Sequence, residues 1–443
     1  MKFNSNQRLI LLQFCLIAIL LIDTSLLKVY DLNYKSFIPE HDRIILFSVI
    51  ALTCLAIEFI LFGSLKNLFM IPLSNMKGLV KSSYILSLFS SLIVGAVVVF
   101  LILQLFQGKS YSIYISMSII TISYVVAAIL VTTLSYLFLS WYKSTRRLTV
   151  FLYFFSMLVI SINLVLSATI SDLRLSDRPT EIKDFIGGSV ELSAGRHYVI
   201  DNLYKITSIL SFFSLWLTTA LLMYNYRDKM KIRAVSYWIL LSIPLLYYLL
   251  ISLYQLFLAN IMLSFLTEDP VTVSIIITAI MSLSKPIGGF TFAVAFWRIS
   301  KSVSYERTIK TFMTISGFGI LMLFSADQAT SQTLAPYPPY GLPTVTILII
   351  AAFLMLIGIY NSASLVSTNT ELRKSIYKHA HEPELLRLIG HAEMEKEVQN
   401  TVTRLTRDKE LVKDANFPLD LDESELKKYL EFVVREVKKG GVE

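Results

Sequence analysis

The sequence predicts an all-α fold, a polytopic transmembrane helical bundle of about ten spans with both termini cytosolic, followed by a short helical C-terminal tail. Two observations lead to this prediction. Of the 443 residues, 55% are hydrophobic and only 16% are charged, which is far more apolar than a soluble domain. The apolar residues also gather in runs of about 20, the length at which a helix crosses about 30 Å of hydrocarbon.

Ten apolar runs qualify as spans by length. They lie at about 9–29, 44–65, 84–106, 112–142, 148–171, 206–224, 236–258, 271–297, 311–324 and 344–365. The first run begins after basic residues, as a signal peptide does, but its stretch LILLQFCLIAILLI is followed by Asp23 and by no small-residue cleavage site, so we expect an uncleaved anchor. The spans define a transmembrane helical domain, 1–365, and leave 366–443 as a cytosolic helical tail.

The charges of the loops predict the orientation, because Lys and Arg in short loops favour the cytosol. With the N-terminus inside, the cytosolic loops hold 14 basic and two acidic residues, whereas the outer loops hold eight basic and twelve acidic residues. The sequence therefore predicts a multi-pass protein of the cell membrane with cytoplasmic N- and C-termini.

Four charged residues remain inside the predicted spans. Asp23 and Lys28 lie near the outer end of the first span, where their side chains can reach the interface. Glu58 and Lys285 lie deeper, where a charge costs about 2.5 kcal/mol or more. Glu58 and Lys285 are therefore the candidate intramembrane charged pair.

Lys285 stands in the stretch MSLSKPIGGF, in the middle of the eighth predicted span. Pro286 removes a backbone donor, and Gly288 and Gly289 are weak helix formers. One interpretation is a helix break whose freed carbonyls line a polar cavity together with Lys285 and Glu58. The other is a kinked helix in which the glutamate neutralises the lysine and only fixes helix register. A water-accessible cavity would favour transport, and a dry, packed pair a structural role.

The outer segment 325–343, SADQATSQTLAPYPPYGLP, has no basic residue and four prolines among tyrosines. This composition predicts a rigid interfacial or partly re-entrant cap. The other long outer loop, 172–205, is expected to connect spans, and neither segment contains a catalytic signature.

The tail is expected to form two helices, one beginning at Pro383 and one over DESELKKYLEFVVREVKK. The second has an apolar docking face formed by Leu426, Tyr429, Leu430, Val433 and Val437. This face is expected to pack on the neighbouring helix, on a second copy of the chain or on a protein partner. The tail is slightly acidic, so nucleic acid is not an expected partner.

No residue pattern predicts a catalytic or metal site. Cys15 and Cys54 both fall in apolar runs, and neither supports a disulfide framework or redox motif. His379, His381 and His391 are expected at the surface, since His-x-His spacing on a helix points the rings apart. Phosphate-binding loops, nucleophile elbows and zinc-protease motifs do not occur. We therefore expect no cofactor, no metal and no enzymatic activity.

A resemblance to a known protein family lies in three stretches of the last third of the chain. They are APYPPYGLPTVTI, GIYNSASLVSTNTELRKSI and LLRLIGHAEMEKEVQ. The chain resembles a family of multi-pass archaeal integral membrane proteins with a short cytosolic helical tail and no assigned activity. The resemblance implies a location in the cell membrane and no particular chemistry.

Three classes of function are compatible with this organisation. A sensory, regulatory or scaffold protein would use the outer loops and the bundle as input and the C-terminal helices as docking and output. A secondary transporter of a small solute would use the broken span around Lys285. Only 16 glycines occur, fewer than broken, closely packed helices favour. A membrane enzyme is the third class, and the first class is preferred.

Overall fold

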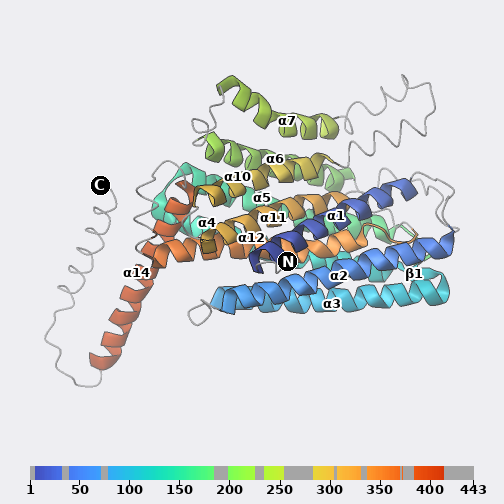
Figure 1. Cartoon of the computed structure of the whole chain (residues 1–443), viewed down its shortest axis with the longest axis horizontal. Helices are drawn as coiled ribbons and strands as arrows, with labels where there is room; N and C mark the ends of the chain where they lie inside the picture. Colours follow the sequence, from blue (N-terminus) through green and yellow to red (C-terminus); the bar gives the residue numbers. More distant parts are fainter. Residues whose placement is uncertain are drawn as a thin grey trace.

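The computed structural model describes residues 5–31, 39–70, 78–183, 198–224, 234–253, 283–303, 307–330, 337–369, 372 and 384–413. In these ranges the chain forms eleven helices and two three-residue strands (Figure 1), so the predicted all-α class is confirmed. The helices are α1 (Ser5–Asp31), α2 (Glu40–Met70), α3 (Gly78–Gly108), α4 (Ile113–Thr145), α5 (Leu148–Ser176), α6 (Tyr198–Tyr224), α7 (Ala234–Leu253), α10 (Ser284–Ser302), α11 (Arg307–Thr330), α12 (Leu342–Thr368) and α14 (Glu384–Lys413).

Each predicted span coincides with one of these helices, over all or part of its length. Among the described helices, seven are long and apolar enough to cross a membrane, namely α2, α3, α4, α5, α6, α11 and α12. This set is consistent with a multi-pass protein embedded in a membrane, although it is smaller than the ten predicted spans. One boundary matters for the site: the span predicted at 311–324 is part of α11, which continues to Thr330.

Helix α12 forms the centre of the bundle. Every residue from Leu342 to Ala363 is buried, and α12 contacts α1, α2, α3, α4, α11 and α14. A helix that is apolar on all sides is stable when protein surrounds it. Figure 1 shows α12 between α11 and α2, with α3 along one edge of the bundle and α7 along the opposite edge.

Helix α3 turns large apolar side chains outward, among them Phe89, Leu92 and Phe100. Its inward side is lined by small or branched residues such as Ser87, Ser91 and Val94, all of which are buried. An outer surface of this kind suits a hydrocarbon environment, in which exposed apolar side chains carry no penalty.

The segment before α12 closes one end of the bundle. Residues 337–341 are buried, and the Tyr340 hydroxyl donates to the Arg43 carbonyl oxygen at 3.0 Å. Strands β1 (Ser110–Ser112) and β2 (Glu181–Lys183) form an antiparallel pair in which Tyr111 faces Ile182. Of the segment 325–343 predicted as a cap, residues 325–330 instead belong to α11, 331–336 lie outside the described residues, and 337–341 are buried.

Candidate functional site

A buried ion pair joins α10 to α11. Lys285 Nζ lies 2.5 Å from Asp327 Oδ2, and the two side chains are only 7% and 8% exposed. Lys285 lies in the first turn of α10 and Asp327 in the last turn of α11. Because a buried charge is costly without a partner, each of the two side chains compensates for the burial of the other.

Three further donors surround the Asp327 carboxylate. Oδ1 accepts hydrogen bonds from Tyr124 of α4 at 3.3 Å and from Ser167 of α5 at 3.1 Å. Oδ2 lies 3.5 Å from the Asn163 amide nitrogen of α5, in addition to Lys285. Four donors, one of them cationic, are the environment that an ionised carboxylate needs inside a protein.

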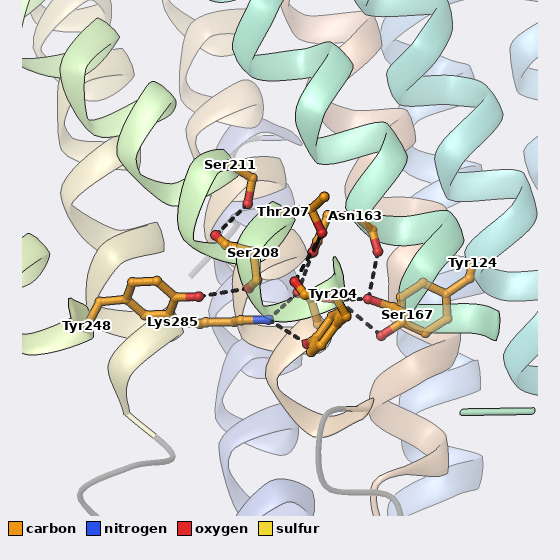
Figure 2. A network of polar contacts seen from close by, with 10 residues as sticks. Tyr124, Asn163, Ser167, Tyr204, Thr207, Ser208, Ser211, Tyr248 and Lys285 are labelled. Carbon is orange, nitrogen blue, oxygen red and sulfur yellow. Dashed lines mark hydrogen bonds and ion pairs between the residues drawn. The ribbon is translucent and has the colours of Figure 1, made fainter. Parts of the chain in front are cut away.

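Helices α6 and α7 complete the arrangement. Lys285 also donates to the Tyr204 hydroxyl at 3.1 Å, with Nζ 5.4 Å from the centre of that ring. Thr207 donates to Asn163 Oδ1 at 3.2 Å, and Ser208 and Tyr248 share a hydrogen bond of 2.7 Å. The resulting Lys285–Asp327 network, drawn in Figure 2, comprises Lys285, Asp327, Tyr124, Asn163, Ser167, Tyr204, Thr207, Ser208 and Tyr248.

A small cavity lies beside the pair. Its volume is about 10 Å³, and polar side chains including Asn163, Ser208 and Ser211 line it together with Phe212 and Phe324. A polar cavity of this size has room for about one water molecule. The ion pair is therefore tightly packed, and the space next to it suits a bridging water rather than a solute.

The structure does not bring Glu58 and Lys285 together, which corrects the predicted pair. Lys285 is bound to Asp327, whereas Glu58 of α2 contacts Thr346 of α12 and Cys54 of its own helix. The sequence does not identify Asp327 as the partner, because the apolar run ends at Phe324 and places Asp327 in the outer loop. The segment SADQAT contains neither proline nor glycine, and this was the available signal that the helix continues.

At the predicted helix break around Pro286, the structure has the beginning of helix α10. The helix begins at Ser284, so Pro286 occupies the first turn, where the backbone N–H has no partner within the helix. Gly288 and Gly289 lie inside α10 and do not interrupt it. A Cβ on Gly288 would meet the Phe212 ring at 2.1 Å, so this glycine permits close packing of α6.

Asp23 is fully buried rather than at an interface. Its carboxylate accepts from the backbone nitrogens of Gly341 and Thr344, both at 3.0 Å, and from the Thr344 hydroxyl at 2.6 Å. The N-cap residue Gly341 has no side chain, so Asp23 of α1 caps α12 from another helix. The motif GLPT, with proline in the first turn, marks the helix start but not the residue that caps it.

Helix α14 begins at Glu384, which agrees with the expected start at Pro383. The predicted docking face, Leu426, Tyr429, Leu430, Val433 and Val437, lies outside the described residues, as do His379 and His381. Within the described ranges, no group of three or more His, Cys, Asp or Glu side chains is placed to hold a metal ion.

Comparison with protein-family models, curated proteins and solved structures finds no match to this chain. The resemblance to archaeal membrane proteins therefore stays an expectation, and the argument for function rests on the geometry.

Proposed function

We propose that the chain is an integral membrane protein of sensory, regulatory or scaffold type, with ten spans and both termini cytosolic. The outer loops and the bundle receive the input, and the C-terminal helices dock or transmit the output. The observation that supports this proposal is that α4 contacts both the Lys285–Asp327 network and α14.

The two contacts lie far apart on one continuous helix. Tyr124 of α4 donates to Asp327. Trp141, 17 residues further along α4, donates its indole N–H to Glu393 of α14 at 3.0 Å. Ser144 of α4 also donates to Glu395. At 1.5 Å per residue, α4 connects the network to α14 over about 25 Å.

Helix α14 is held by its first turns. Leu385, Leu386 and Ile389 are buried, and Gly390 lies directly against Val366, because a Cβ there would meet the valine side chain at 2.2 Å. The C-terminal half of α14 projects away from the bundle (Figure 1). A helix that is docked by its first turns can report a change in the bundle by a change in docking.

Coupling of this kind requires a structural element that has two arrangements. Both the Lys285–Asp327 network and the docking contact must shift the equilibrium between these arrangements. In the proposal, that element is α14, docked on or released from α4 and α12. Because helices are stiff, a shift of α4 at Tyr124 moves Trp141 and so alters the Glu393 contact.

The proposal predicts that Tyr124→Phe increases hydrogen exchange in 384–399, measured by mass spectrometry on the full chain in detergent. Trp141→Phe should increase exchange there directly, because it removes the donor to Glu393. Tyr248→Phe is the matched control, since it removes a hydroxyl from the same network without touching α4. Equal effects of Tyr124→Phe and Tyr248→Phe, or none from Tyr124→Phe, would contradict coupling through α4.

The proposed orientation predicts the accessibility of two labels. A tag placed after Glu443 should react only from the cytosolic side, and a reporter inserted into 172–205 only from the outside, because basic loops favour the cytosol. Accessibility from the opposite side at either position would reject the ten-span arrangement.

Secondary transport of a small solute is the second candidate. The observation that favours it is the small cavity beside Lys285 in the first turn of α10. A volume of about 10 Å³ accommodates about one water, so a solute would require α10 to separate from α6. The sensory proposal needs no such opening and is preferred.

A further inference from the structure

Glu58 is a buried carboxyl group in an environment unlike that of the other carboxylates in the bundle. It is 1% exposed and lies on α2 at the contact with α12. Among the described residues, its polar neighbours are Thr346, whose Oγ1 lies 3.0 Å from Oε1, and Cys54, whose Sγ lies 3.8 Å from Oε1. Neither neighbour is a cation.

This contact has too few hydrogen-bond donors to stabilise Glu58 as an ionised carboxylate. The Thr346 hydroxyl has one hydrogen and lies 2.8 Å from the Pro343 carbonyl oxygen, which can only accept, and 3.0 Å from Glu58 Oε1. If the hydroxyl donates along the shorter contact, the longer one needs a hydrogen from Glu58. The Cys54 thiol also has one hydrogen and lies 3.6 Å from the Pro343 oxygen.

Two of the three other buried carboxyl groups among the described residues, Asp327 and Asp23, provide the comparison; the third, Glu393, accepts a hydrogen bond from Trp141. Asp327 receives hydrogen bonds from Lys285, Tyr124 and Asn163, and the Ser167 hydroxyl lies 3.1 Å from Oδ1 and 2.9 Å from the Asn163 carbonyl oxygen. Asp23 receives two backbone N–H groups and a hydroxyl at the N-terminus of α12, where the helix dipole favours negative charge. An ionised Glu58 would have at most one hydroxyl and one weak thiol donor, which leaves most of the cost of burying its charge uncompensated.

We propose that Glu58 is a proton-binding site. Its carboxyl group is protonated and donates a hydrogen bond to the Thr346 hydroxyl oxygen, and the Thr346 hydroxyl donates a hydrogen bond to the Pro343 carbonyl oxygen. The ligand of this site is the proton. The proposal goes beyond the function proposed above and does not depend on an output role for α14.

Loss of this proton would place an anion in the contact between α2 and α12. Among the described residues, the titratable groups packed near this contact are Cys54 of α2, Asp23 of α1 and Tyr84 of α3, which packs on Phe62 of α2. None of them supplies a positive charge. Release of the proton therefore requires water to enter or α2 to move from α12, so proton occupancy and helix contact are linked.

The experiment is an infrared spectrum of the full chain in detergent at neutral pH. A protonated carboxyl group has a C=O stretch that ionised carboxylates lack. We expect this band in the wild-type protein and its loss in Glu58→Gln. Glu393→Gln is the matched control, because Glu393 is also 1% exposed but accepts a hydrogen bond from Trp141. The band should persist in that variant.

If Glu58→Gln does not fold, the wild-type protein still decides the question. Labelling the glutamate carboxyl carbons with ¹³C should shift the band to lower frequency, and Glu393→Gln should leave the shifted band in place. A spectrum without the band, a band that ¹³C-glutamate does not shift, or a band that disappears in Glu393→Gln would overturn the proposal.

Discussion

Replacing either partner of the Lys285–Asp327 pair should lower the stability of the bundle more than any conservative change elsewhere in the network. Lys285→Met leaves the Asp327 carboxylate with neutral donors only, and Asp327→Asn leaves a buried ammonium without a counter-ion. Breaking a buried ion pair from one side typically costs about 3–5 kcal/mol. The measurement is thermal unfolding of the full chain in detergent, and each variant should unfold well below the wild-type protein.

The double variant Lys285→Met/Asp327→Asn should recover much of this loss. Neither charge is then buried alone, so the double variant should lose much less stability than the sum of the two single losses. The matched control combines Lys285→Met with Glu58→Gln, whose side chain contacts Thr346 and not Lys285. Those two effects should add. Additive losses for Lys285 and Asp327, or recovery with Glu58→Gln instead, would show that the pairing is wrong.

The sequence predicted that Lys285 needs a buried acidic partner, because the cost of an unpaired charge in an apolar span does not depend on the fold. It could not identify the partner, since that depended on the point at which α11 ends. The apolar run of this span ends at Phe324, whereas helix α11 continues to Thr330 and includes buried polar residues there. Helix ends defined by apolar runs therefore hide the polar residues that buried sites use.

The central position of α12 could not be predicted from the sequence either. Helices α3 and α12 are both predominantly apolar, yet α3 exposes Phe89 and Phe100 whereas α12 is enclosed. Lipid is as apolar as a leucine side chain, so a lipid-facing helix and a central one have the same composition. The helical class follows from composition, but the neighbours of each helix depend on side-chain packing between segments far apart in the chain. The Asp23 cap on α12 is such a case.

Gly358→Ala should be the second strongly destabilising substitution, because Gly358 is a point of close contact between α12 and α11. A Cβ at this position would lie 2.1 Å from Ser316 Oγ, 2.5 Å from the Phe312 carbonyl oxygen and 3.0 Å from the Ser316 nitrogen. Two of these atoms belong to the backbone of α11, so the whole helix must shift. Overpacking of this kind costs typically about 1–3 kcal/mol, which thermal unfolding in detergent should detect.

The matched control for this substitution is Gly63→Ala on α2, where no heavy atom lies within 4 Å of the added methyl group. That variant should be neutral or more stable by up to about 1 kcal/mol, the difference in helix propensity between the two residues. Adding Ser316→Ala to Gly358→Ala should restore only part of the loss, because the contact with the Phe312 oxygen remains. Full restoration would place the closest contact at the serine side chain, and equal stability of the two glycine variants would contradict the close approach of α11 and α12.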